Sequence, residues 1–492
     1  MIAEAPTARH RRWRTLDNAA GGLALDLGLY AASALFAAIT AVTSTLLPHR
    51  AWGAVAAVGY LVAALAVVAQ LLLRRRIPTS RLVGLPARWA VTGLTWASTA
   101  LLPVIWQSFE RATGRTDRAQ EEVLVVEQAG IRLLDHGTPY LGRDAIAALP
   151  PGEQLLGYTP YQPGMAIFGL PRALLDSPWT DSRVWFAVGT ALALALAINA
   201  LRTPTPTAGD HPRGAALLRG VQAATVLPIC ALTLATGGDD LPVLALCLLA
   251  LAFAAVDRPG RAGIAVGLAG ALKLFAWPIA LVLIIWGLTR RAGGRVAAGA
   301  VGLPVAALLP ALLVDRDALI ENVLRFPLGH GLVTSPAQSP FPGYLIASAL
   351  PAGRLVASAL LVAAGVAIAV RQADQGSPVA AAVWLVVFLV FAAGLSPLAF
   401  PRSISAAEAR RRSADDGRPV VYWRPGCQYC LRLRFRLGGA SRRVHWVDIW
   451  RDPEGAAEVR AITGGDETVP TVVVSGRSRV NPDPAWLRRR LG

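Results

Sequence analysis

The sequence has almost no lysine and little charge for its length. Of its 492 residues only 16% are charged and 54% are hydrophobic, whereas a soluble domain of this size would carry more charge. Lys273 is the single lysine, so the net charge of +17 comes from arginine. The arginines punctuate loops and do not line one face, which argues against a nucleic-acid-binding protein. This distribution favours a membrane protein that follows the positive-inside rule.

Cysteine is also scarce, since the chain has four. Cys230 and Cys247 lie in apolar runs, where cysteine is most simply a small buried hydrophobe. Cys427 and Cys430 form a Cys-x-x-Cys pair, and only His445 lies near them in the sequence, so a four-ligand zinc site is not expected. A P-loop and a dinucleotide fingerprint are both missing. We therefore expect no metal and no tightly bound cofactor.

Long apolar runs with Arg-rich or Pro-rich breaks fill the first four-fifths of the chain and predict about ten transmembrane helices. The predicted spans are 25–47, 52–73, 89–106, 184–200, 217–235, 241–256, 264–288, 296–314, 355–370 and 380–398. Arg11, Arg12 and Arg14 place the N-terminus in the cytoplasm. Three spans then deliver the long polar loop 107–183 to the outer face.

Several ionisable residues in this part are candidates for chemistry. Glu121 and Glu122 lie in the outer loop, where a membrane enzyme could hold a general base, although a solvated loop without a role for these acids is the alternative. Asp239 and Asp240 lie at a span end on the same predicted face, where they could orient a metal or a sugar, or cap the span. Lys273 lies inside an apolar run, and such a group faces a cavity or a partner unless it snorkels to the interface.

Three stretches carry a family resemblance: Glu122 onward through Gly130-Ile131-Arg132-Leu133-Leu134-Asp135-His136-Gly137-Thr138-Pro139-Tyr140, then Tyr158-Thr159-Pro160-Tyr161-Gln162-Pro163-Gly164, and Gly270-Ala271-Leu272-Lys273-Leu274-Phe275. They resemble polytopic glycosyltransferases that use polyprenyl-phosphate sugars, including actinobacterial α-mannosyltransferases of glycolipid assembly. The resemblance implies a catalytic base in the first outer loop. That base would be Glu122, with Glu121 next to it, where the family more often has Asp.

The same resemblance implies a polyprenyl-phosphate sugar as donor and a glycolipid as acceptor. We expect Lys273 or Arg325 to place positive charge against the departing phosphate if they line the same cavity as the base.

Beyond the polar stretch 401–417, read as a linker, the pattern changes to short strands and helices. Strands are predicted at 420–423, 444–449 and 472–475, and helices at 430–437, 453–463 and 485–491. This order is thioredoxin-like. The predicted fold is thus a polytopic α-helical membrane domain (1–400) fused through the linker to a small α/β domain (418–492).

The Cys-x-x-Cys pair lies at a strand-to-helix corner. Cys427 would sit at the positive end of a helix, which stabilises the reactive thiolate. Cys430, one turn deeper, could resolve a mixed disulfide formed at Cys427. We expect a cis peptide before Pro470 that leaves the Val469 backbone free to pair with a bound thiol peptide.

Several short stretches of this domain resemble the glutaredoxins, most closely the mycoredoxins: Cys427-Gln428-Tyr429-Cys430, Asp448-Ile449, Asp452-Pro453, Gly464-Gly465, Thr468-Val469-Pro470-Thr471 and Asn481-Pro482. The resemblance implies mycothiol or glutathione as co-substrate and protein disulfides as partners. It places Tyr429, Thr468, Val469 and Pro470 at the substrate. The domain departs from the family at Pro425-Gly426, where a tryptophan usually precedes the first cysteine.

We expect a multi-pass cell-membrane protein in contact with lipid and with no nucleic acid partner. Arg402 and Arg410 to Arg412 favour a cytoplasmic redoxin domain, although 264–288 could be a hairpin, which would put that domain outside. One alternative function is a non-catalytic membrane anchor that tethers the redoxin or passes electrons. A transporter would predict inverted repeats, and we find none in the sequence.

Overall fold

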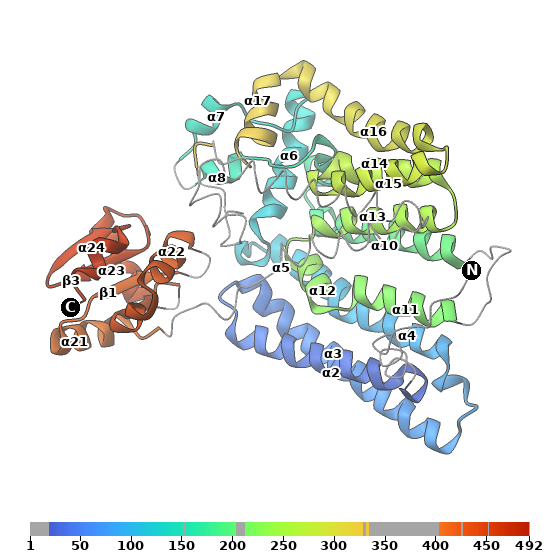
Figure 1. The fold of residues 1–492 in the computed structure, drawn as a ribbon, viewed down its shortest axis with the longest axis horizontal. Helices are drawn as coiled ribbons and strands as arrows, with labels where there is room; N and C mark the ends of the chain where they lie inside the picture. Colours follow the sequence, from blue (N-terminus) through green and yellow to red (C-terminus); the bar gives the residue numbers. More distant parts are fainter. Residues whose placement is uncertain are drawn as a thin grey trace. The chain divides into compact units, whose positions relative to one another are not determined.

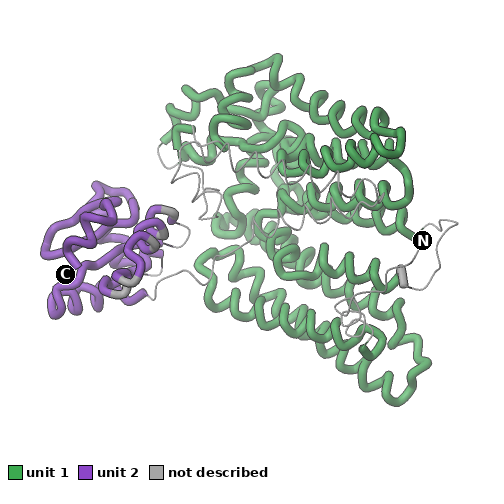
Figure 2. The backbone as a smooth tube through the Cα atoms, viewed as in Figure 1, with its two compact units in different colours: residues 1–333, 365–384 green, residues 334–364, 385–492 purple. Residues whose placement is uncertain are grey.

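The structure is a computed structural model that describes residues 19–150, 153–202, 212–327, 331–333, 403–424, 427–450 and 452–491. The chain divides into two compact units, residues 1–333 with 365–384 and residues 334–364 with 385–492 (Figure 2). The described part of the second unit starts at Ser403. We call the first the membrane unit and the second the redoxin unit, and describe each by itself.

The described part of the membrane unit is entirely helical (Figure 1). Its longer helices are α2 (Leu23–Thr43), α3 (Leu47–Arg76), α4 (Leu85–Trp96), α5 (Leu102–Ala112), α6 (Glu121–His136), α10 (Ser182–Arg202), α11 (Pro212–Thr225), α12 (Pro228–Thr236), α13 (Asp240–Ala255), α14 (Pro259–Leu272), α15 (Trp277–Thr289) and α16 (Gly293–Val314). Short helices α7 (Arg143–Ala147), α8 (Gln154–Gly157), α9 (Leu170–Leu174) and α17 (Arg316–Ile320) complete it.

Among the described residues, five helices are long and apolar enough to cross a membrane: Ala19–Thr43, Leu47–Arg76, Leu85–Ala112, Ser182–Arg202 and Gly293–Val314. A sixth span results if Gly214–Thr225 and Pro228–Thr236, bent by 42°, count as one. The predicted spans 355–370 and 380–398 lie outside the described residues. This unit is therefore a multi-pass membrane domain, as the sequence predicts.

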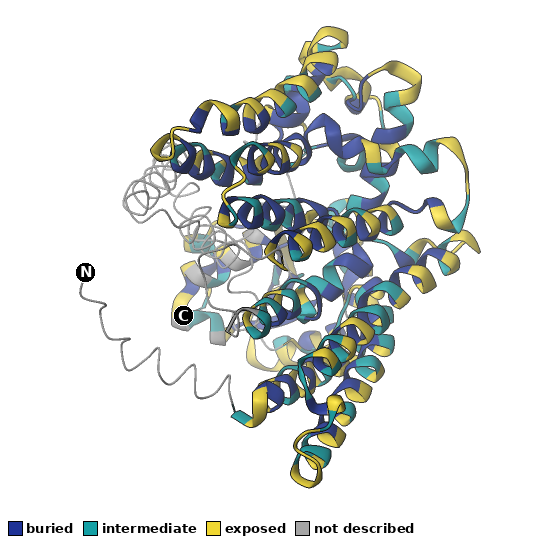
Figure 3. Ribbon diagram, turned by 90° about the vertical axis from the view of Figure 1, so that its right-hand side faces the viewer, coloured by how far each residue is buried: buried dark blue, intermediate teal, exposed yellow. Residues whose placement is uncertain are grey.

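The outer faces of these helices are exposed (Figure 3), and many of the exposed residues are large and apolar. Val42, Leu94 and Leu313 are 77%, 72% and 75% exposed. Large aliphatic side chains that are exposed on many helices are compatible with contact to lipid tails. Helices also suit that surrounding because their backbone polar groups are hydrogen-bonded within the helix.

The prediction of one span at 264–288 is wrong. Helix α14 ends at Leu272, Lys273 is extended (φ −147°, ψ 146°), and α15 begins at Trp277. Arg290 Nη1, just after α15, lies 3.5 Å from Asp257 Oδ1, just before α14. The two helices therefore form a hairpin with Lys273 at its tip. This position suits Lys273, because a charged side chain is tolerated at a helix break that supplies partners.

The redoxin unit is built on a four-stranded sheet in the order β2-β1-β3-β4. Strand β1 (Val420–Trp423) is parallel to β2 (His445–Asp448) and antiparallel to β3 (Thr471–Val474), which pairs antiparallel with β4 (Arg477–Val480). Its helices are α21 (Ala406–Asp416), α22 (Gln428–Leu437), α23 (Pro453–Thr463) and α24 (Pro484–Arg488). This small α/β fold confirms the predicted class.

Two features of this unit differ from the prediction. The stretch read as a linker contains α21, in which Ala406 and Ala409 are fully buried and Ile404 N–H donates to Trp446 O at 3.0 Å. The sequence does not predict this helix, because its apolar face consists of only two alanines. Edge strand β4 was not predicted either, because its residues are all exposed and do not alternate in hydrophobicity.

Candidate functional site

Cys427 and Cys430 lie at the end of β1 and the start of α22. The parallel strands β1 and β2 both end at this edge of the sheet, and the chain turns there into the helix. The Cys430 backbone N–H donates to Cys427 Sγ at 3.2 Å, and the Cys427 thiol donates to Val469 O at 3.2 Å. Cys427 therefore sits on unpaired N–H groups at a helix N-terminus, which favours a sulfur anion.

The two sulfurs have opposite electrostatic surroundings. The hydrogen bond with Cys430 and the charge of Arg424 lower the pKa of the Cys427 thiol, although burial opposes them. Burial raises the pKa of Cys430, and its neighbour Cys427 raises it further. A reactive thiolate beside a protonated thiol is the arrangement that a nucleophile and a resolving cysteine need.

The predicted substrate-binding residues surround Cys427. The Val469–Pro470 peptide is cis, as expected, and both residues are buried beside the sulfur. Tyr429 and Thr468 are exposed at the same edge. The carbonyl of Val469 accepts from the Cys427 thiol in this form of the protein.

Trp450 and Arg424 also lie near this edge, although neither was predicted as a site residue. Trp450 follows β2, is 45% exposed, and lies under the Arg424 guanidinium at 5.9 Å. The Arg424 carbonyl in turn accepts from Cys427 N–H at 3.2 Å. The signal was available, because residues that follow two adjacent parallel strands emerge side by side.

In the membrane unit, three predicted acids from two stretches of the sequence gather around Lys273. Lys273 Nζ lies 2.8 Å from Asp239 Oδ2 and 2.5 Å from Asp240 Oδ1. A Cβ on Gly237 would lie 3.5 Å from Glu122 Oε2, which places Glu122 beside the α12–α13 turn that carries both aspartates. We call Glu122, Asp239, Asp240 and Lys273 the Lys273 cluster.

Glu122 differs from its neighbour in its surroundings. It is half-buried at the start of α6, whereas Glu121 is exposed. Burial raises the pKa of Glu122, and the nearby charge of Asp239 raises it further, while Lys273 opposes the rise. Because a raised pKa makes a carboxylate a stronger base, Glu122 suits proton abstraction better than a fully solvated acid.

The loop 158–162 forms one wall of the cluster. The Tyr161 ring lies 4.7 Å from Lys273 Nζ, and Gln162 N–H donates to Leu272 O at 3.1 Å. On the other side, Gln120 N–H donates to Thr236 O at 2.9 Å, which joins the start of α6 to the end of α12. These contacts fix the three elements relative to one another.

Arg325 is not part of the Lys273 cluster. Its Nη1 lies 3.4 Å from Glu321 Oε2, and its side chain is 51% exposed. Arg143 Nη1 and Tyr158 OH also bind Glu321, at 2.8 and 2.9 Å. We call Arg143, Tyr158, Glu321 and Arg325 the Glu321 cluster. Its member Tyr158 precedes Tyr161 of the Lys273 cluster wall by three residues in the same loop.

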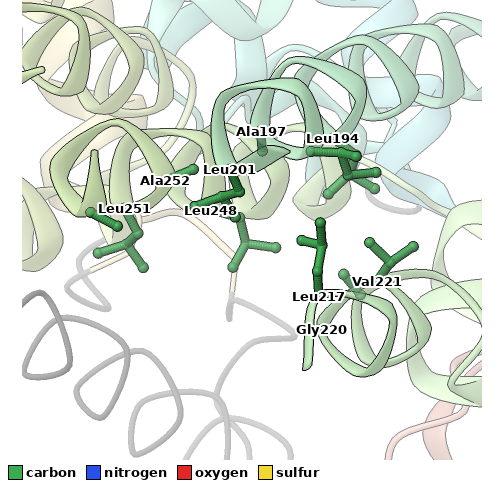
Figure 4. Close-up of a pocket in the computed structure, with 12 residues that line it drawn as sticks. Leu194, Ala197, Leu201, Leu217, Gly220, Val221, Leu248, Leu251 and Ala252 are labelled. Atoms are coloured by element: carbon green, nitrogen blue, oxygen red, sulfur yellow. The ribbon is translucent and has the colours of Figure 1, made fainter. Parts of the chain in front are cut away.

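An apolar pocket of about 300 Å³ lies between α10, α11 and α13 (Figure 4). Its α13 side includes Leu248, Leu251 and Ala252 (Figure 4), which follow Asp240 by about 12–18 Å along that helix at 1.5 Å per residue. It has the dimensions and chemistry for a hydrocarbon chain. Among the described residues no group of three or more His, Cys, Asp or Glu could hold a metal ion.

Comparison with protein families gives two matches. Residues 158–401 match glycosyltransferase family 87, and residues 420–479 match glutaredoxin. The first match includes Tyr161, Asp239, Asp240, Lys273 and Arg325 but begins after the two candidate glutamates.

Two proteins from Mycobacterium tuberculosis strains, each named "Putative glutaredoxin", are 33% identical to this chain over 73 residues, which are 15% of this chain and 87% of theirs. No solved structure shows significant similarity to the chain. The chain therefore joins a membrane part that matches glycosyltransferase family 87 to a C-terminal domain that belongs to the glutaredoxin family.

Proposed function

We propose that the redoxin unit is a dithiol oxidoreductase with mycothiol or glutathione as its thiol co-substrate. The observation that carries this is Cys427 Sγ at the start of α22, where it accepts from Cys430 N–H. The Cys427 thiolate attacks one sulfur of a substrate disulfide, forms a mixed disulfide and releases the other half as a thiol. Cys430 then attacks Cys427 Sγ, releases the second thiol and leaves a Cys427–Cys430 disulfide, which two molecules of the co-substrate reduce.

Replacement of each cysteine tests these roles separately. Cys427→Ser is expected to abolish disulfide reduction, because the remaining thiol at this site, Cys430, is buried and has a pKa raised by that burial. Cys430→Ser is expected to retain the first step and accumulate a mixed disulfide detectable by mass spectrometry. Equal residual turnover in both variants would contradict the assignment.

For substrate recognition, we propose that Val469, Pro470, Thr468 and Tyr429 contact the bound disulfide. Once Cys427 is a thiolate it no longer donates to Val469 O, so this carbonyl can accept from a substrate amide. Protein disulfides and low-molecular-weight thiols are the partners this edge would take.

We propose that the membrane unit transfers a hexose from a polyprenyl-phosphate sugar to a glycolipid hydroxyl, with Glu122 as general base. The convergence of Glu122, Asp239 and Lys273 from three elements carries this proposal. Lys273 holds Asp239 and Asp240 in place, and Glu122 takes the acceptor proton as the oxygen attacks the sugar C1. The bond from C1 to the phosphate oxygen breaks, and the lipid phosphate departs.

The departing phosphate needs a positive charge beside it. The Lys273 cluster cannot supply that charge, since Lys273 is already paired with two aspartates. Arg325 is half exposed at 3.4 Å from Glu321, so its guanidinium can turn toward an anion. We propose the Glu321 cluster as the phosphate end of the site. The apolar pocket between α10, α11 and α13 supports a lipid-linked substrate.

The test is sugar transfer from radiolabelled polyprenyl-phosphate sugars in membranes. Glu122→Gln is expected to slow transfer by about 10²–10⁴-fold with little effect on lipid binding, whereas the exposed Glu121→Gln is the matched control and stays near wild type. Arg325→Gln is expected to weaken donor binding. If wild type transfers nothing from a panel of donors, the membrane unit is an anchor for the redoxin.

For the domain limits, we propose a membrane domain at 1–400 and a redoxin domain that begins at Ser403, because α21 packs into the redoxin core. We place that domain in the cytoplasm, where thiols are kept reduced and the dithiol can be recycled.

A further inference from the structure

The arginines of the redoxin unit fall into two groups according to their partners. On the side formed by α21 and α23, three arginines form ion pairs with acids. Arg410 pairs with Glu454 and Glu458, Arg412 with Glu408, and Arg460 with Glu467. This side therefore has little net charge.

Five arginines on α22, α24 and β4 differ from these. We define the basic patch as Arg432, Arg436, Arg479, Arg488 and Arg490, all of which are exposed. Among the residues that the structure describes, no carboxylate lies within ion-pair distance of any of them, and α22 itself contains no acidic residue.

The five residues form one continuous surface. Arg432 and Arg436 are one turn apart on α22. Arg488 Nη2 donates to the Arg436 carbonyl, which joins α24 to α22. The guanidinium groups of Arg479 and Arg490 lie 5.3 and 4.1 Å from the Trp486 ring, which joins β4 to α24.

Five like charges on one face repel each other, and only salt or an anionic partner relieves that repulsion. A surface of phospholipid head groups is the anionic partner that this chain itself brings near. The sequence predicts a last span at 380–398, a few residues before Ser403, so the domain is held at high effective concentration next to a bilayer. Clustered arginine and a half-buried tryptophan are the residue types that bind such interfaces.

We propose that the basic patch binds the redoxin domain to an anionic phospholipid surface. The chain then holds the domain at the membrane twice, once by covalent linkage and once by charge. Neither the thiol chemistry at Cys427 nor sugar transfer is needed for this second attachment.

The test uses the isolated domain, residues 403–492. It has its own buried core, and the two mycobacterial relatives consist largely of the matching segment, with 87% of their length covered. Sedimentation with vesicles of phosphatidylcholine, with and without phosphatidylglycerol, measures binding at low and at high salt. Binding is expected only with phosphatidylglycerol and is expected to weaken as salt rises.

Two triple variants remove the same charge from opposite sides. Arg436→Gln/Arg488→Gln/Arg490→Gln is expected to bind about 100-fold more weakly than wild type. Arg410→Gln/Arg412→Gln/Arg460→Gln is the matched control and is expected to stay within about threefold, because paired arginines attract lipid less. Both variants should reduce a small soluble disulfide at the wild-type rate, which shows that they are folded.

Three results would overturn the proposal. Equal loss in both triple variants would show that net charge alone attracts the domain. Equal binding to vesicles without phosphatidylglycerol would show that charge does not matter. Tight binding to double-stranded DNA with none to vesicles would assign the patch to nucleic acid.

Discussion

At the scale of single residues, Arg424 is placed to set the reactivity of Cys427. Its charge helps to lower the pKa of that thiol, and its guanidinium is held over the Trp450 ring at 5.9 Å. Pro425-Gly426 replaces the aromatic residue that usually precedes the first cysteine in this family. Trp450 supplies an aromatic face from a different part of the chain, beside the Arg424 cation that directly precedes Pro425.

Arg424→Gln is expected to slow alkylation of Cys427 by iodoacetamide at neutral pH by roughly two- to fivefold, since less thiolate is present. Removal of the nearby cation raises the pKa of the Cys427 thiol. The rise of the alkylation rate with pH is therefore shifted to higher pH than in wild type. Arg432→Gln, which removes an exposed arginine from α22, is the control. An unchanged pH profile for Arg424→Gln would exclude this role.

Lys273 is a second residue whose neighbours decide its role. Its side chain and that of Asp239 are 14% and 6% exposed, whereas that of Asp240 is 54% exposed, so the Asp239 pair is the one that matters for stability. Lys273→Met leaves a buried carboxylate without its partner and is expected to cost about 3–5 kcal/mol of stability.

Thermal unfolding in detergent checks this expectation. Lys273→Met/Asp239→Asn removes both charges and is expected to recover most of the lost stability, because no buried charge is then left alone. A single variant as stable as wild type would show that Lys273 reaches solvent and does not depend on Asp239.

The residues of both sites were largely predictable, but their pairings were not. The cost of an ionisable group in an apolar run predicts that Lys273 has a partner, and both aspartates were candidates by their position at a span end. Sequence could not show that Arg325 lies with Glu321 and away from Lys273, because that depends on how the helical turn Glu321–Arg325, which follows α17, packs beside the loop at Tyr158. Trp450 was missed because a lone aromatic after a strand is usually packing.

At the scale of elements, prediction succeeded where an apolar pattern ran uninterrupted. Helices α2, α3, α10 and α16 match predicted spans because each is a long apolar run. Hydropathy averages across a short break, so α14 and α15 were read as one span. Helix α21 was missed for the opposite reason. Of its eleven residues only two alanines are buried, and the other nine are polar, charged or alanine on the exposed side.

Glycine explains how α14 packs so closely against α16. A Cβ on Gly263 would clash with Val296 O, and one on Gly267 would clash with Gly299 O, so the two backbones touch. Small residues four apart permit this approach in a membrane, where packing replaces the hydrophobic effect. The hairpin tip at Lys273 is positioned by this contact.

Gly267→Val is therefore expected to push α14 from α16, lower the yield of folded protein and displace Lys273 from Asp239, so transfer activity falls with stability. Gly302→Val is the matched control on α16, because a Cβ there meets nothing within 4 Å. Detergent-solubilised yield and unfolding temperature compare the two. Similar losses in both variants would mean that valine itself is not tolerated in these helices.

At the scale of the whole molecule, the hairpin changes the count of membrane crossings. If the shorter helices α13, α14 and α15 cross the membrane as well as the longer spans, α13 brings a chain with a cytoplasmic N-terminus back to the cytoplasm, and α14, α15 and α16 then bring it out. Ala311 near the end of α16 packs against Tyr140 of the outer loop, which agrees with this count. Two further spans, at 355–370 and 380–398, would return the chain to the outside.

A cytoplasmic redoxin domain therefore requires an odd number of crossings between Val314 and Ser403, one more than the two that the sequence predicts. The reducing thiol pool that the Cys427–Cys430 pair needs lies in the cytoplasm, so we expect that third crossing.

Labelling with a membrane-impermeant maleimide decides the side. Cys230 and Cys247 are first replaced by alanine, so that Cys427 and Cys430 are the remaining thiols. Cys427, with its lowered pKa, is expected to react only after the cells are opened. Glu153→Cys, exposed in the outer loop, serves as the control that must react in intact cells. If Cys427 reacts in intact cells as fast as this control, two spans follow α16, and the redoxin acts on disulfides at the outer face with a reductant that must be supplied there.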